Sequence, residues 1–149
     1  QIIEEKNWRR RTVFDIAKNA IKKISINNLL EPEYSFSLQL HPTKLYDLDS
    51  TLTTFNNQSI FHFISSFKGI NCESFKSDKS KIEFATPVHE LVINNDTLRT
   101  YTIGDSEEKK KEENFNVERM YATLNNGDLM LIQNYVFNKV LITIDELRK

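Results

Sequence analysis

The strongest hairpin signal in this chain lies in the stretch Met120-Tyr121-Ala122-Thr123-Leu124-Asn125-Asn126-Gly127-Asp128-Leu129-Met130-Leu131-Ile132. Two apolar runs flank the polar triplet Asn125-Asn126-Gly127. Asn-Gly between apolar runs is the strongest short-range signal for a β-hairpin, because asparagine and glycine tolerate the left-handed backbone that the turn needs. The stretch therefore predicts an antiparallel hairpin whose strands cover residues 115–124 and 128–137.

Strand signals extend from this hairpin in both directions. Residues 34–41 alternate strictly between apolar and polar side chains, which is typical of a strand with one buried face. Shorter apolar runs predict further strands at 70–75, 81–86, 89–93, 97–103 and 140–144. Thr143 and Glu146 have the spacing of a capping box and predict a final helix.

Two helices are predicted before the strand-rich half. In the first, apolar residues recur at spacings of three and four, at Val13, Ile16, Ala17, Ala20, Ile21 and Ile24. This N-terminal helix is assigned to residues 1–28 and can continue an upstream coiled coil. The second is rich in aromatic residues, spans 59–67 and ends before Gly69. We expect one α+β domain over residues 1–149, with both helices packed on one face of a mostly antiparallel sheet.

Composition narrows the classes of function. The chain has 149 residues, a net charge of −1, three glycines and one cysteine, Cys72. So few glycines allow neither of the glycine-rich phosphate-binding motifs, and the charge gives no field that attracts nucleic acid. No apolar run is long enough to cross a membrane, and one cysteine fits a reducing compartment. We expect an intracellular location, no cofactor and no metal, since the three histidines lack metal-site spacing.

One motif has a chemical meaning. Asp47-Leu48-Asp49-Ser50-Thr51 resembles the first motif of the haloacid-dehalogenase phosphohydrolases, DxDxT. The resemblance implies that Asp47 is a nucleophile, that Asp49 is a general acid/base and that magnesium neutralises the phosphate. That family's motif follows a buried parallel strand, whereas Asp47 here follows Pro42 closely. The alternative interpretation is that the two acids pin a turn or cap a helix.

The N-terminal segment is basic. Residues 1–30 contain seven lysines and arginines against three acidic residues. A partner-binding site is assigned to Trp8, Arg9, Arg10, Arg11 and Phe14, which combine positive charge with aromatic rings. Residues 104–114 are a run of mixed charge and are predicted to form a mobile loop.

These patterns favour a non-catalytic protein–protein interaction or assembly domain of an intracellular scaffold, forming a homodimer or a heteromer. Ten phenylalanines and five tyrosines supply more apolar surface than one thin sheet can bury. Exposed aromatic patches mark partner sites. In outline, residues 61–84 are similar to the RWD-like domains of kinetochore and spindle components. Two alternatives remain open: a phosphohydrolase that uses Asp47 and Asp49, and a basic-helix adaptor that binds phosphates or an acidic partner.

Overall fold

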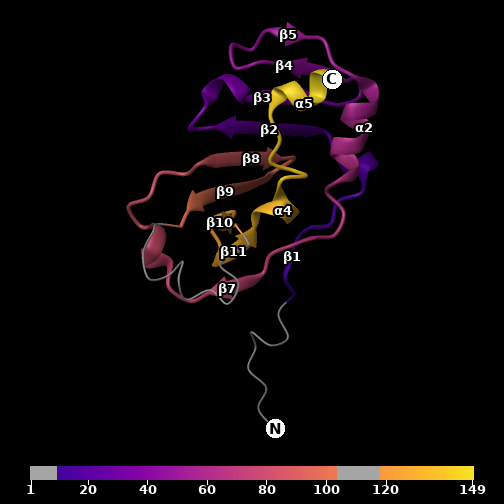
Figure 1. Ribbon diagram of the computed structural model, residues 1–149. Coiled ribbons are helices and arrows are strands. Elements are labelled where there is room, and N and C mark those ends of the chain that lie inside the picture. Colours follow the sequence, from indigo (N-terminus) through magenta and orange to yellow (C-terminus); the bar gives the residue numbers. More distant parts are fainter. Residues whose placement is uncertain (1–9, 104–117) are drawn as a thin grey trace.

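The computed structural model describes residues 10–103 and 118–149, and within these ranges the chain is mainly β-structure (Figure 1). A nine-stranded sheet has the order β5-β4-β3-β2-β8-β9-β10-β11-β7, and every neighbouring pair is antiparallel. Its strands are β2 (Lys23–Asn28), β3 (Phe36–Gln39), β4 (Lys44–Tyr46), β5 (Leu52–Thr53), β7 (Ser74–Lys76), β8 (His89–Ile93), β9 (Asp96–Thr102), β10 (Arg119–Leu124) and β11 (Leu129–Gln133).

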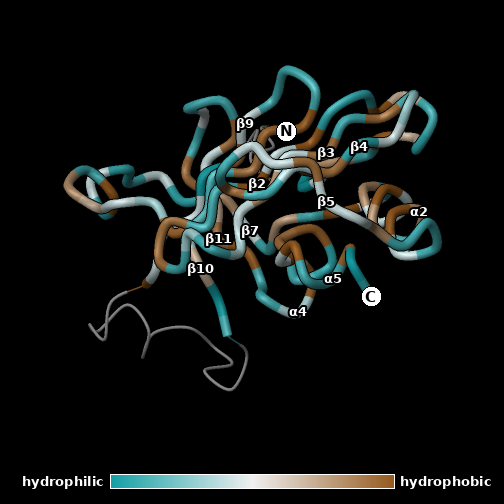
Figure 2. The backbone as a smooth tube through the Cα atoms, turned by 90° about the horizontal axis from the view of Figure 1, so that it is seen from above, coloured by the Kyte–Doolittle hydropathy of each residue, from teal (hydrophilic) through white to brown (hydrophobic). Residues whose placement is uncertain are grey.

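A second layer lies over one face of this sheet. It contains a two-stranded sheet, β1 (Thr12–Phe14) with β6 (Ile70–Asn71), and three short helices, α2 (Asn57–Ser65), α4 (Asn134–Phe137) and α5 (Ile144–Arg148). Three single 3₁₀ turns complete the described elements: η1 (Lys18–Ala20), η2 (Pro32–Tyr34) and η3 (Lys79–Ile82). Figure 2 shows α2, α4 and α5 on the same side of the large sheet. The arrangement is a sandwich-like, mainly β fold, so the predicted α+β class is wrong.

The predicted N-terminal helix over residues 1–28 is the main error. Residues 1–9 lie outside the described ranges, and the rest forms β1, η1 and β2. Ile24 and Ile26 alternate with Ser25, which is the period of a strand, and β-branched residues favour extended backbone. β2 pairs with β3 and with β8, a strand more than 60 residues away. These long-range pairs override the helical spacing of the same apolar residues.

Other predicted elements are confirmed with shifted ends. The helix at 59–67 is α2, and strands at 89–93 and 34–41 correspond to β8 and β3. The strand predicted at 81–86 is wrong, because Asp78 Oδ1 accepts the amide of Ser80 at 2.9 Å and starts η3 instead. The strand at 140–144 is also wrong, since α4 turns the chain after β11 and α5 begins at Ile144. The loop predicted at 104–114 lies outside the described residues.

The central hairpin forms at the predicted turn, but its second strand ends at Gln133, and residues 134–137, predicted as strand, form α4. β10 and β11 pair in register, and Asn125 and Asn126 have φ of 53° and 60°, the left-handed values that a type I′ turn needs at both central positions. The amide of Gly127 donates to the carbonyl of Leu124 at 2.9 Å. Asn125 Oδ1 also accepts the amide of Thr97 at 2.8 Å, which ties the turn to the start of β9.

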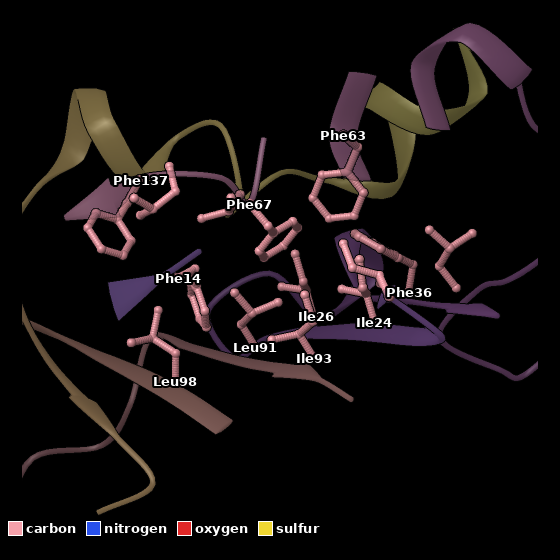
Figure 3. Close-up of a cluster of buried hydrophobic side chains, with 14 of the residues drawn as sticks. Phe14, Ile24, Ile26, Phe36, Phe63, Phe67, Leu91, Ile93, Leu98 and Phe137 are labelled. Atoms are coloured by element: carbon pink, nitrogen blue, oxygen red, sulfur yellow. The ribbon is translucent and has the colours of Figure 1, made fainter. Parts of the chain in front are cut away.

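The main core lies between the two layers (Figure 3). Register places Ile24, Leu91 and Leu98 on the inner face of the sheet, and all three are 0% exposed. A smaller cluster on the outer face contains Tyr101, Tyr121, Leu129 and Leu131. The outer face of β2, β3 and β4 carries Ser25, Ser37 and Tyr46 and stays partly exposed, as is common for one face of an antiparallel sheet.

His89 gives the fold a pH dependence. Burial lowers the pKa of its imidazole below the ordinary value of 6.5, and Nδ1 lies 2.9 Å from Thr100 Oγ1. The folded state therefore binds fewer protons than the unfolded state just below pH 6.5, so the free energy of unfolding falls as pH falls through this window. Denaturant titrations at several pH values between about 7.5 and 5 measure the free energy of unfolding across this window, because the range brackets the ordinary pKa of histidine. His89→Asn is expected to flatten this slope; an unchanged slope contradicts the assignment to His89.

Candidate functional site

Four leucines with large exposed side chains gather at one end of the large sheet. β2 ends and β3 begins at this end, where Leu29 and Leu30 are 43% and 69% exposed. Register pairs Ser37 with Tyr46 and Tyr46 with Leu52, so the β4–β5 turn leaves the sheet at the same end and adds Leu48 and Leu52. In Figure 1 both connections lie at the left of the upper half.

Carboxylates lie on the same two connections as these leucines. The β2–β3 connection carries Glu31 and Glu33, and the β4–β5 turn carries Asp47 and Asp49. Residues 24–43 and 45–67 contain no lysine or arginine. Among the described ion pairs, none involves these four carboxylates. We call this surface the acidic leucine end; it consists of Leu29, Leu30, Leu48, Leu52, Glu31, Glu33, Asp47 and Asp49.

Local hydrogen bonds hold the β2–β3 connection open. Asn28 Oδ1 accepts the amide of Glu31 at 2.9 Å, and the amide of Asn28 donates to Ser35 Oγ at 2.9 Å. Pro32 then starts η2. Because the backbone is held by these bonds, Leu30 points away from the core instead of collapsing onto it.

Asp47 pins the β4–β5 turn. Its Oδ1 accepts the amides of Asp49 and Thr51, each at 2.9 Å, and Ser50 takes the left-handed φ of 60°. The turn role that the sequence predicts for Asp47 is therefore confirmed. The motif resembling DxDxT follows an antiparallel strand, β4, so its local backbone differs from the parallel-strand setting that the resemblance implies.

Replacing Asp47 tests this role. Asp47→Ala removes both accepted bonds and is expected to lower the free energy of unfolding by about 1–2 kcal/mol. Asp47→Asn keeps an acceptor oxygen in the same place and is expected to retain most of the stability. Chemical denaturation of both variants measures the difference. Equal losses of unfolding free energy in the two variants would show that the charge of Asp47, and not its accepted hydrogen bonds, stabilises the turn.

A cavity lies beyond the opposite end of β2. Ala17, Lys18, Asn19, Ser65 and Lys68 line it, and its volume is about 370 Å³. Two lysines flank it. Lys18 Nζ lies 4.6 Å from the ring centre of Phe61, which is 55% exposed, and Lys68 pairs with Asp15 at 3.3 Å with both side chains more than half exposed. We call this cavity and its rim, including Phe61, the lysine pocket.

A second cavity, of about 410 Å³, lies where α2 meets α5. Polar and charged side chains dominate its lining, which includes His62, Lys139, Glu146 and Lys149. The amides at the start of α2 are already occupied, since Asn56 Oδ1 accepts from Gln58 and Ser59. The carboxylate in the lining of this cavity is also engaged, because Glu146 pairs with Lys149 at 3.3 Å.

The structure separates the residues assigned from sequence to a partner site. Trp8 and Arg9 lie outside the described ranges. Arg10 and Arg11 are exposed, and Arg11 Nη1 donates to the carbonyl of Glu73 at 3.1 Å. Phe14 is 2% exposed and packs edge-on against Phe67. A partner that meets this segment would therefore contact the arginines rather than the ring of Phe14.

The remaining chemical groups do not converge in the described structure. His41, His62 and His89 lie on separate elements, and Cys72 is buried in the core. Across residues 10–103 and 118–149, no three histidine, cysteine or acidic side chains gather as a metal site requires. The same part of the chain has no helix with the length and apolarity to cross a membrane.

The sequence missed the acidic leucine end, although one signal was present. Leucines and acids are neighbours in Leu29-Leu30-Glu31 and alternate in Asp47-Leu48-Asp49, and the nearest lysine or arginine in the sequence is Lys44. Only the strand order β2-β3-β4-β5 and its antiparallel register show that these two segments share one end of a sheet. Comparison with known protein families, with curated proteins and with solved structures gave no match to this chain.

Proposed function

We propose that this chain is a non-catalytic protein–protein interaction domain that acts in the assembly of an intracellular scaffold or structural complex. The observation that supports it best is the acidic leucine end. Two connections, separated along the chain by β3 and β4, place four exposed leucines at one sheet end, and exposed apolar patches mark protein interaction sites. Carboxylates without an ion pair among the described residues add the polar rim that interfaces have.

Sedimentation velocity over a wide concentration range tests the proposal. The expected result is a dimer or larger species whose fraction rises with concentration, or a stable complex with a second protein recovered by crosslinked pull-down. A profile that stays monomeric at every concentration, with no partner recovered, contradicts it.

The lysine pocket favours a second candidate, an adaptor for phosphates or an acidic partner. Lys18 and Lys68 both line a cavity of about 370 Å³, together with Ala17, Asn19 and Ser65. Binding of inorganic phosphate or of a polyglutamate peptide, measured by calorimetry, should weaken as salt rises because exposed charges are screened. Binding that does not change with salt argues against this candidate.

The phosphohydrolase alternative has its own test. If Asp47 were a nucleophile, Asp47→Asn would abolish hydrolysis of a generic phosphate monoester such as p-nitrophenyl phosphate. The hydrogen bonds that occupy Asp47 Oδ1 favour the structural role instead. Loss of activity in Asp47→Asn, with the fold intact, would restore the enzymatic interpretation.

A further inference from the structure

We propose that the acidic leucine end of one molecule docks on the lysine pocket of a second copy, so that molecules join head to tail. The inference rests on the proposed assembly function and names its partner and its two surfaces. The two surfaces are matched in charge, in shape and in position along the same strand.

Charge is the first match. The acidic leucine end offers Glu31, Glu33 and Asp49, which are exposed and form no ion pair among the described residues. The lysine pocket offers Lys18, whose ammonium lies over the ring of Phe61 and forms no ion pair among the described residues, and Lys68, which pairs with the exposed Asp15. Opposite potentials across an interface steer association and fix register.

Shape is the second match. Leu30 is 69% exposed and is the most exposed leucine of the acidic leucine end. The cavity of the lysine pocket holds about 370 Å³, whereas roughly 150 Å³ accommodates a benzene-sized group. The cavity is therefore large enough for a leucine side chain, and the exposed ring of Phe61 adds apolar surface at its rim.

Position is the third match. η1 precedes β2 and carries Lys18, while Leu29 and Leu30 follow the last residue of β2. Six residues of strand separate the two surfaces, a rise of roughly 20 Å. One molecule cannot bring them into contact with each other, but it can present one surface to each of two neighbours. Because the contact joins two different surfaces, it is heterologous, and it extends into an open chain unless the rotation closes a ring.

Two variants each remove one surface. Leu30→Ser with Glu33→Lys changes the acidic leucine end without touching Asp47, which pins its turn. Lys18→Glu with Lys68→Glu reverses the lysine pocket. All four side chains are exposed, so both variants are expected to keep the wild-type fold, checked by circular dichroism and by the midpoint of thermal unfolding. The control variants are Lys139→Glu with Lys149→Glu, from the other cavity, and Phe84→Ser, from a distant exposed site.

Sedimentation velocity of each variant alone and of a mixture tests the proposal. The wild type and the controls are expected to form oligomers that grow with concentration and weaken with salt. Each surface variant alone is expected to associate at least about tenfold more weakly, which corresponds to 1.4 kcal/mol. An equimolar mixture is expected to recover a one-to-one dimer and nothing larger, because each variant retains one intact surface.

The outcomes separate this inference from the proposed function. Wild-type association by either surface variant alone overturns the head-to-tail arrangement, as does a mixture that stays monomeric. A wild type that is monomeric but binds a different protein overturns the inference and leaves the interaction function standing. A wild type that is monomeric and binds no protein overturns both.

Discussion

Phe67→Ala is expected to cost about 3–5 kcal/mol of folding free energy, the largest effect of any single substitution considered. Phe67 is 0% exposed and lies at the centre of the aromatic cluster in Figure 3. Its ring meets Phe14 at 5.5 Å and Phe63 at 5.4 Å between centres, both edge-on. Such pairs contribute roughly 0.5–1.5 kcal/mol each beyond the burial of area.

The position of Phe67 explains why the surroundings cannot close around the gap. Phe14 belongs to β1, Phe63 to α2, and the carbonyl of Phe67 accepts the amide of Ile16 at 2.9 Å. Two segments, β1 and α2, therefore pack against one ring, and the backbone of Phe67 is itself bonded to Ile16 just after β1. A cavity at a site that cannot collapse is costly, because the surrounding atoms lose their contacts outright.

Urea denaturation of the wild type and of Phe67→Ala measures the difference in the free energy of unfolding. In a thermal melt, the midpoint of Phe67→Ala is expected to fall by roughly 10 °C. Phe67→Leu is expected to lose less, since it retains part of the volume. The matched control is Phe84→Ala, whose side chain is 94% exposed and should change stability by less than about 0.5 kcal/mol. Similar losses in Phe67→Ala and Phe84→Ala would refute the central role of Phe67.

Glu73→Gln is expected to produce the second-largest loss of folding free energy, about 2–3 kcal/mol. The carboxylate of Glu73 accepts Arg119 Nε at 2.9 Å and 3.0 Å and also bonds Gln133 Nε2. The Arg119 side chain is 8% exposed and that of Glu73 is 23% exposed. Removing one partner of a fully buried pair costs roughly 3–5 kcal/mol, and the partial exposure of Glu73 reduces this value.

A double-mutant cycle isolates the interaction between the two charges. Glu73→Gln leaves Arg119 without its carboxylate, and Arg119→Met leaves the carboxylate with Gln133. The double variant is expected to lose less than the sum of the two single variants, because the interaction between the two side chains can be lost only once. Strictly additive losses would contradict a direct interaction. Lys68→Ala removes the exposed pair with Asp15 and is the control, with a loss of at most about 1 kcal/mol.

The hairpin shows where sequence alone was sufficient. Asn125, Asn126 and Gly127 determine their own backbone, because few residues adopt the left-handed conformation that this turn requires. The pairing of β10 with β11 is then local, and no distant segment can change it. The same holds for Asp47, whose side chain bonds the amides two and four residues ahead.

The N-terminal region shows the opposite case. Val13, Ile16, Ile21 and Ile24 fit the spacing of a helix, and Ile24 and Ile26 fit that of a strand. The choice depends on β8, which completes the pairing of β2 from far along the chain. A short window of sequence contains no information about that partner, so the helical prediction could not be corrected from it.

The candidate surfaces divide in the same way. The local pieces follow from neighbouring residues: the central hairpin, helix α2, the Asp47 turn, and the acids and leucines within each connection. The folded chain alone brings two connections to one sheet end and places Lys18 and Lys68 beside one cavity. Turns and caps are fixed by bonds between near neighbours, whereas strand order is fixed by pairings and core contacts between segments that are distant in the sequence.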